Sequence, residues 1–339
     1  MLLPRVSFSS KRFPGAFACA RQLSTGAAHV PTSPLGAYKA FLASGPTLRT
    51  GYTDLFVRHA NMQGRGQAAE FRLLCRTGEF NDQSSGQVSG FVQANLVAVP
   101  LENAFDFLRF CLHNPRACPL LDVTEPGDPV PRTVAPTADL RIDLPKYRVW
   151  RNGEVAEERD EVVDMWSRDM VGFLLGCSFS WEQLLTDAQL TPRHVEEGCN
   201  VPMYKTNLPN ERVGPFGGQL VVSMRPYLPS QLGKVHQITS CYPGAHGGPI
   251  HWGDPSQIGV CVSGEPDWGD KVSMREGEVP AFWACGVTPQ EALAEAQLPL
   301  AITHSPGHMF VADLMDSELL VPHHSTHSSL KGGNEAASM

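Results

Sequence analysis

The sequence predicts an α/β protein of mixed α+β organisation, in which a helical N-terminal half and a mixed sheet in the C-terminal half form one large domain. Its 339 residues are enough to bury a large core. A hydrophobic content of 42% with 18% charged residues is typical of globular proteins. Apolar residues recur at helical spacing in the first half, whereas from Leu220 onward they form short runs bounded by Gly, Pro and Asp.

Two helices and one strand are expected in the first part of the chain. Apolar residues at helical spacing predict a helix over 68–75, which Gly78 would end. A second helix is expected over 100–114, because proline is tolerated in a first turn and an Asn-Pro pair closes the segment. Between them, 90–99 alternates enough to predict a strand. The proline-rich segment 126–136 is either a surface loop or a linker between subdomains, and we favour the loop.

The longest helical pattern lies in the middle of the chain. Residues 157–185 combine one apolar stripe with a charged opposite face, which predicts an amphipathic helix with a solvated side. Ser180 and Gln183 have the spacing of a capping box for a following helix. Thr191, with the proline after it, predicts the start of a short helix that Gly198 ends.

Four short apolar runs in the second half predict buried strands. Polar, glycine-rich segments lie at the ends of these runs, so a ligand site is expected at the strand ends. No internal repeat, P-loop or dinucleotide fingerprint is present in the sequence. The runs are 220–224, 258–262, 281–284 and 309–312.

The two ends of the chain differ from its middle. Residues 1–53 hold no Asp or Glu but several Arg and Lys among Ser, Phe and Leu, which is typical of a mitochondrial presequence. Arg21 and the three residues after it resemble a matrix-protease site, and the alternative is an unstructured cytosolic N-terminus. We expect a presequence over 1–28, a folded domain over 29–318 and a disordered polar tail over 319–339. The expected location is the mitochondrial matrix.

Charge and cysteine content narrow the range of partners. A net charge of -8 argues against a nucleic-acid surface, which needs clustered Lys and Arg. No apolar run approaches the ~20 residues that span a bilayer. The 9 cysteines form no CxxC pair and mostly lie among apolar residues, as in a protein of a reducing compartment. The expected partner is a small molecule, with no nucleic acid and no membrane, and a homo-oligomer is left open.

Several long strings in the sequence are uncommon. They are CLHNPRACPLLD (111–122), FLLGCSFSWE (173–182), HGGPIHWGDP (246–255) and FWACGVTPQ (282–290). Through these strings the chain resembles, from Pro34 to Leu314, the family of mitochondrial D-glutamate cyclase and its bacterial hydro-lyase relatives. The resemblance implies elimination of water from D-glutamate to give 5-oxo-D-proline, with 29–318 as the catalytic domain. It also implies that animal members carry a second C-terminal domain, so this chain would be a short form.

Lactam closure of that substrate demands particular groups. A base must take a proton from the amine, an acid must protonate the departing oxygen, and the oxyanion needs donors. His246 and His251 flank a Gly-Gly-Pro turn and are the first candidates for proton transfer, with Asp254 as an orienting group or base. Cys285, where a strand is expected to meet a turn, is a candidate catalytic nucleophile. The alternatives are histidines that hydrogen-bond a tight loop and a buried structural cysteine.

Substrate binding is assigned to a wider set of residues. Arg225 could clamp a carboxylate with its guanidinium fork or form a structural ion pair. Asp267 and Asp270 could bind substrate or cap their own turn. The backbone from Gly286 to Gln290 could bind an anion at the start of a helix. The expected substrate-binding residues are Tyr204, Thr206, Asn207, Arg225, Asp267, Asp270, Gly286, Thr288, Gln290, His304 and His308.

A divalent metal is the main open point about cofactors. His304, His308 and Asp313 are suitable ligand types, but Pro306 and Gly307 argue against a regular helix there, and HExxH is absent. No cofactor is firmly implied and no metal ligand is assigned. The alternative functions are a metal-assisted hydratase or hydrolase on another small carboxylate and a non-catalytic protein that binds an acidic metabolite.

Overall fold

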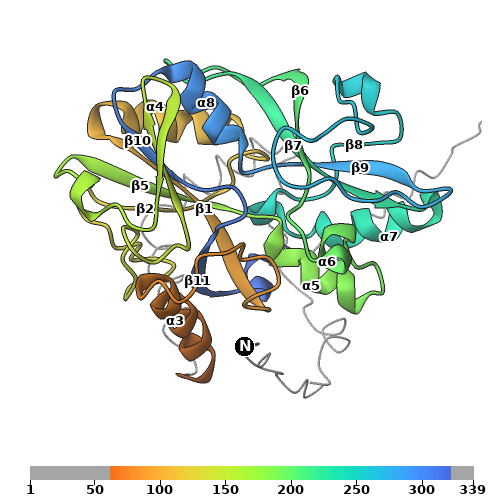
Figure 1. Cartoon of the computed structure of the whole chain (residues 1–339), viewed down its shortest axis with the longest axis horizontal. Helices are drawn as coiled ribbons and strands as arrows, with labels where there is room; N and C mark the ends of the chain where they lie inside the picture. The colour runs from red at the N-terminus through yellow and green to blue at the C-terminus, as the bar shows by residue number, and fades with distance from the viewer. Residues whose placement is uncertain (1–61, 322–339) are drawn as a thin grey trace, which may run out of the picture. The chain divides into compact units, whose positions relative to one another are not determined.

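The computed structural model describes residues 62–321, which form two antiparallel β-sheets with helices packed against them (Figure 1). The mixed α+β class expected from the sequence is confirmed. The expected presequence over 1–28 lies outside the described residues, and so does the expected tail from residue 322 onward. Within 62–321, every helix is too short or too polar to cross a membrane.

The larger sheet has seven strands in the order β2-β5-β1-β10-β3-β4, with β11 also paired to β1. Every pairing in it is antiparallel. β1 lies at its centre, because it pairs with β5 along one edge and with β10 and β11 along the other. The strands are β1 (Phe91–Pro100), β2 (Leu120–Val123), β3 (Tyr147–Arg151), β4 (Glu154–Arg159), β5 (Met170–Gly176), β10 (Ala301–His304) and β11 (Phe310–Met315).

The smaller sheet has four strands in the order β6-β7-β9-β8, again antiparallel throughout. In Figure 1 it lies on the opposite side of the molecule from β2, β5 and β10. Its central strands β7 and β9 are paired from Val222 with Ala284 to Tyr227 with Val279. The strands are β6 (Met203–Pro209), β7 (Gln219–Tyr227), β8 (His251–Trp252) and β9 (Val279–Ala284).

The helices cover both sheets. α4 packs on β1 and β5, α8 on β7, α3 on β11, and α5 against β1 and α7. The α-helices are α3 (Met62–Arg76), α4 (Leu101–His113), α5 (Phe179–Asp187), α6 (Arg193–Glu197), α7 (Pro229–Thr239) and α8 (Thr288–Ala296). The 3-10 helices are η1 (Val163–Met165), η2 (Pro243–Ala245), η3 (Pro255–Ile258) and η4 (Asp316–Leu319).

Aromatic side chains from separate segments join the two sheets in one core cluster. The ring of Phe107 on α4 lies 4.9 Å from that of Phe173 on β5 and 5.1 Å from that of Phe216, before β7. All three side chains are fully or almost fully buried, and burial of each contributes about 2–3 kcal/mol. The same cluster takes in Leu293 of α8, so both sheets pack against a shared set of apolar residues.

Several expected elements are confirmed. α3 covers the expected helix over 68–75, and Gly78 follows it with φ of 72°. β1 and α4 match the strand and helix expected over 90–114. The segment 126–136 is a loop without strand or α-helix. The short helix ended by Gly198 is α6, and Gly198 has φ of 67°.

The long helix expected over 157–185 is wrong. The segment holds the end of β4, η1, β5 and the start of α5. Every residue of β5 is buried, so its unbroken apolar run fits a helical stripe as well as a strand. β4 is an edge strand whose side chains are exposed, and its charges are those of a solvated edge rather than of a helix face.

Three smaller expectations also need correction. The N-terminal half is not mainly helical, because β1 to β5 all lie before Cys177. The run 258–262 is not a strand: Asp254 caps η3, and Gly259 ends it with φ of 72°. Ser180 is not a helix cap, because it lies inside α5 and its Oγ accepts the N–H of Gln93.

Candidate active site

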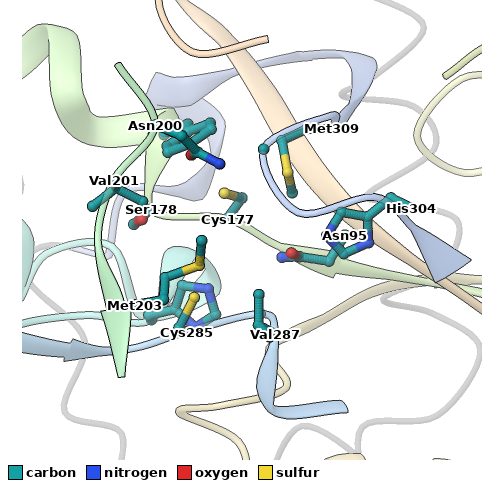
Figure 2. A pocket seen from close by; sticks show the side chains of 14 residues that line it. Asn95, Cys177, Ser178, Asn200, Val201, Met203, Cys285, Val287, His304 and Met309 are labelled. Carbon is teal, nitrogen blue, oxygen red and sulfur yellow. The ribbon is translucent and has the colours of Figure 1, made fainter. Parts of the chain in front are cut away.

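A cavity lies where the ends of the two sheets meet (Figure 2). Asn95 of β1 and His304 at the end of β10 line it from the larger sheet. Met203 at the start of β6 and Cys285 just after β9 line it from the smaller sheet. Its empty volume is about 300 Å³, counting the part open to solvent.

Close backbone packing at two glycines brings the cavity walls together. A Cβ on Gly286 would overlap the side chain of Asn95. A Cβ on Gly176, the last residue of β5, would overlap the carbonyl of Gly244 in η2. Nδ2 of Asn95 donates to the carbonyl oxygen of Gly176 at 2.8 Å, which leaves Oδ1 as the acceptor that the amide offers.

Two histidines line the cavity, and each is held through Nδ1. Nδ1 of His246 lies 2.7 Å from the carbonyl oxygen of Arg116, and Nδ1 of His304 lies 3.2 Å from that of Leu96. A carbonyl only accepts, so both Nδ1 atoms carry the hydrogen and donate. Nε2 of each ring is then a lone-pair acceptor, and within 62–321 neither Nε2 has a hydrogen-bond partner.

Burial keeps both imidazoles neutral. Desolvation lowers the pKa of His246 to about 4 and that of His304 to about 4, against hydrogen bonds that favour the charged form. The positive charges of Arg225 and Arg116 lower the pKa of His246 further. His246 also has φ of 72°, a left-handed backbone conformation that is strained for a residue with a side chain. Placing this ring therefore costs folding free energy.

Two cysteine thiols complete the polar part of the wall. Burial raises the pKa of Cys285 to about 11, although the N–H groups of Val287 and Gly286 point at its sulfur. Burial raises the pKa of Cys177 further still. Both groups are thiols at neutral pH, so Cys285 is at the cavity as expected but lacks the thiolate that a nucleophile needs.

Arg225 lies behind the cavity wall rather than in it. Its side chain is fully buried, and Nη2 donates to Oε1 of Glu182 at 2.6 Å. The same Nη2 donates to Oγ of Ser178 at 3.0 Å, and Nη1 donates to Oγ of Ser223 at 3.0 Å. The guanidinium fork is therefore occupied by protein groups, which corrects the expectation of a free carboxylate clamp.

Glu182 is the counter-ion of Arg225. Although burial opposes ionisation, the charges of His194 and Arg225 hold the pKa of Glu182 at about 2. Nε2 of His194 lies 2.9 Å from the same Oε1, out of line for a hydrogen bond. Cζ of Arg225 also lies 4.7 Å and 5.3 Å from the ring centroids of Trp181 and Trp283, two rings that contact each other. The structural ion pair named as the alternative is the one observed.

His251 and Asp254 lie outside the cavity lining. Nε2 of His251 donates to the backbone oxygen of Asp254 at 2.8 Å, and its ring stacks on Phe282. Oδ1 of Asp254 accepts the N–H and the hydroxyl of Ser256 at 3.0 Å and 2.8 Å, as the cap of η3. These two residues therefore stabilise a tight surface turn, the alternative that the sequence left open.

Five of the expected substrate-binding residues shape β6 and its neighbouring turn, away from the cavity lining. Asp267 and Asp270 each accept a backbone N–H through Oδ2 at 2.8 Å. Thr206 donates to a backbone carbonyl of β7 at 2.7 Å. Tyr204 is buried and its hydroxyl has no partner within 62–321, and Asn207 is exposed. Neither aspartate caps its own turn, because the two N–H groups belong to Lys205 and Asn200 in and just before β6.

Three more of the expected substrate-binding residues lie outside the cavity lining and support its neighbouring segments. Thr288 begins α8 as expected, and its Oγ1 accepts the N–H of Val221 at 3.1 Å. Nε2 of Gln290 donates to the carbonyl oxygen of His304 at 3.1 Å and so fixes a cavity histidine. Nδ1 of His308 lies 3.1 Å from the carbonyl oxygen two residues before it, and burial lowers its pKa. No group of three His, Cys, Asp or Glu within 62–321 is placed to hold a metal ion.

Several cavity residues were missed from the sequence. They are Asn95, Ser178, Asn200, Met203 and Met309. A signal for the first was present, because Asn95 interrupts the apolar run of β1. For Ser178, the signal was a polar residue two positions after the end of the buried strand β5. The others gave none, since Asn and Met are common in ordinary loops.

The arrangement joins two neutral proton acceptors, an amide oxygen, two thiols and backbone N–H groups around one small space. Such a site can hold a small polar molecule and move protons on it without a permanently charged base. The fold and the cavity together therefore have the character of an acid–base enzyme acting on a small substrate.

Comparisons with known proteins give the family. The family model described as D-glutamate cyclase matches residues 171–313. A "Putative hydro-lyase" of Geobacillus kaustophilus is 54% identical over 250 residues, 74% of this chain and 95% of the relative. A relative of the same name from Rubrobacter xylanophilus is 53% identical over 255 residues, 75% of this chain and 98% of the relative. The chain belongs to the D-glutamate cyclase family, and its class is that of the hydro-lyases.

Solved structures add nothing to this assignment. A nitrogen repressor-like protein of Methanococcus jannaschii is 10% identical with a TM-score of 0.28, covering 69% of this chain and 90% of that one. The value is too low for an argument about the fold.

Proposed function

We propose that this hydro-lyase closes D-glutamate to 5-oxo-D-proline with loss of water. The observation that carries the proposal is the pair of neutral histidines, His246 and His304, lining one cavity with Nδ1 of each tied to the backbone. The family description supports the same reaction.

The proton balance of the reaction matches two neutral bases. D-glutamate enters with an ammonium group and two carboxylates, and the product keeps one carboxylate and an amide N–H. Two protons therefore leave the nitrogen, and the same two convert a γ-carboxylate oxygen to water. In the proposal Nε2 of His246 and of His304 each accept one proton and return it to the departing oxygen. No proton is exchanged with solvent overall.

Other residues in and behind the cavity wall interact with the charged groups of the substrate. Oδ1 of Asn95 accepts from the substrate ammonium and so orients the amine in the cavity that the two imidazoles line. The thiol of Cys285, whose sulfur accepts the N–H groups of Gly286 and Val287, donates to the γ-oxyanion of the tetrahedral intermediate. The buried positive charge of Arg225 stabilises both negative groups from behind the wall.

The test is incubation of the purified chain with D-glutamate and with L-glutamate, each with and without EDTA. The expected result is 5-oxo-D-proline from the D isomer alone, measured by chiral chromatography, at an unchanged rate in EDTA. Activity that EDTA removes and a divalent ion restores would favour the metal-assisted alternative. Binding of D-glutamate without turnover, in a folded sample, would contradict the proposal and favour a binding protein.

We propose that the protein acts in the mitochondrial matrix. The support is the acid-poor, Arg- and Ser-bearing composition of residues 1–53. N-terminal sequencing of the protein recovered from mitochondria should give a start near Ser24. An intact Met1 terminus on protein recovered from the cytosol would contradict this proposal.

A further inference from the structure

Ser178 carries the one hydroxyl among the described residues that line the cavity. It lies between β5 and α5 and is 4% exposed. Its Oγ lies 3.0 Å from Nη2 of Arg225. Because a guanidinium only donates, the serine oxygen accepts this bond and its own hydrogen needs another acceptor. No side chain or carbonyl within 62–321 provides one, so the hydroxyl hydrogen is available to a ligand in the cavity.

Arg225 is fixed through its two terminal nitrogens, while its Nε has no hydrogen-bond partner within 62–321. Glu182 and Ser223 take the other hydrogen bonds of its fork, at 2.6 Å and 3.0 Å. The rings of Trp181 and Trp283 both contact it, and the side chain has no solvent exposure. The hydroxyl of Ser178 is therefore oriented before any ligand arrives, and the charge behind it strengthens it as a donor.

A carboxylate is the ligand group that such a donor fits, since charge-assisted hydrogen bonds of this kind are the stronger ones. D-glutamate has two carboxylates, of which the γ group reacts and the α group stays ionised throughout. The thiol of Cys285 already serves the γ group in the proposed reaction. The α-carboxylate then needs a donor of its own, and Ser178 is the remaining hydroxyl.

We propose that Ser178, oriented by Arg225, binds the α-carboxylate of the substrate and so selects an amino acid over a simple amine. This inference rests on the proposed D-glutamate cyclase function. The α-carboxylate is ionised in both the ground state and the transition state, so the contact contributes equally to both. Its loss therefore raises KM and leaves kcat nearly unchanged.

The test uses Ser178→Ala with 4-aminobutyrate as the probe, because this molecule keeps the amine and the reacting carboxylate of glutamate but lacks the α-carboxylate. The KM for D-glutamate should rise about ten- to hundredfold, as expected for a lost hydrogen bond to a charged group. The inhibition constant of 4-aminobutyrate against D-glutamate should stay within about twofold, because that ligand never makes the contact.

Ser180→Ala is the matched control. Ser180 is 1% exposed and lies two residues further on, but its Oγ accepts the N–H of Gln93 at 3.0 Å and does not line the cavity. It should leave both constants unchanged even where it lowers the melting temperature. This control separates damage to the first turn of α5 from loss of the ligand contact.

Two outcomes would overturn the inference. One is an equal weakening of both ligands in Ser178→Ala, which would place the serine against the shared part of the substrate or make it purely structural. The other is an unchanged KM for D-glutamate. If the wild-type chain turns over neither isomer, the proposed function is wrong, and the Ser178 contact is then tested by calorimetric titration with D-glutamate. Equal affinity of the wild type and Ser178→Ala for D-glutamate, or no binding to the wild type, would refute the contact.

Discussion

At the residue scale, His246 and His304 show how the fold makes a base from an ordinary imidazole. Each Nδ1 is committed to a backbone carbonyl, and burial in the wall of the cavity disfavours the charged ring. A neutral imidazole at pH 7 has its lone pair free, so it accepts a proton without first losing one. A bound ammonium and two carboxylates change this balance, because the negative groups stabilise the imidazolium that forms.

His246→Ala and His304→Ala should each lower kcat by about 10²- to 10⁴-fold, the usual contribution of a general acid–base group. For the wild type, kcat/KM should stay level as the pH falls through 6.5 and decline only toward pH 4, because the free enzyme must hold both rings neutral. Measuring kcat/KM for D-glutamate over a series of pH values tests this pH dependence.

His251→Ala is the matched control for the two histidine variants, because His251 stacks on Phe282 outside the cavity lining. It should keep kcat within about threefold, as expected for a surface substitution away from the chemistry. A loss as large as that of His246→Ala would mean that the turn after the Gly-Gly-Pro segment carries the reaction, as the sequence suggested.

The sequence predicted some of these residues and not others, for a physical reason. His246, His304, Cys285 and Gly286 were expected at a site and all line the cavity. His251 shares the same glycine-rich loop, and nothing in the residue types separates a ring that enters a cavity from one that closes a turn. That difference depends on backbone angles such as the positive φ at His246, which local composition does not fix.

At the element scale, strands at the sheet centre were the hardest to predict. β5 is buried at every position and so loses the alternation that marks a half-exposed strand. β7 and β9 were found because Gly, Pro and Asp bound their apolar runs. The helices α4, α6 and α8 were found from proline at or near their first residue, which is a local signal. Pairing order and antiparallel register depend on contacts distant in sequence.

Gly286→Ala should disrupt the turn between β9 and α8. Its Cβ would overlap the carboxamide of Asn95, which a hydrogen bond to β5 holds in place. Overpacking of this kind costs about 1–3 kcal/mol of unfolding free energy, and the displaced amide should lower turnover as well. Urea unfolding and kcat measured on the same sample check both effects.

Gly233→Ala is the opposite case and serves as the control. Gly233 lies in α7, and a Cβ there meets nothing within 4 Å. Alanine in a helix interior should raise the unfolding free energy by about 0.5–1 kcal/mol and leave kcat unchanged. If both glycine variants changed the unfolding free energy and kcat in the same way, the overlap of a Gly286 Cβ with Asn95 would not be the cause.

At the scale of the whole molecule, the site depends on the two sheets being assembled. Asn95 of the larger sheet packs against Gly286 after β9 of the smaller one, and Glu182 after β5 pairs with Arg225 of β7. Residues from both sheets form the cavity wall, so neither sheet alone makes the site. The buried ion pair also makes separation of the sheets costly, because it would leave a charge without its partner.

The pH dependence of global stability should be dominated near neutrality by Asp316, the first residue of η4. Burial raises the pKa of Asp316 to about 8 from 3.8, and its Oδ1 has no hydrogen-bond partner within 62–321. Between these two pH values the folded state keeps a proton that the unfolded state releases. Unfolding free energy should therefore fall as the pH rises, by about 1 kcal/mol per unit, and level off above pH 8.

Asp316→Asn removes this proton and should flatten the slope between pH 6 and pH 8.5, leaving the variant more stable than the wild type at pH 8.5. The two cavity histidines act in the opposite direction, but only below pH 6.5, where the unfolded chain takes up protons first. Urea unfolding at pH 6, 7 and 8.5 measures the slope. Asp160→Asn, at an exposed position after β4, should reproduce the wild-type slope. Parallel curves for Asp316→Asn and the wild type would show that the buried carboxyl finds a partner that ionises it.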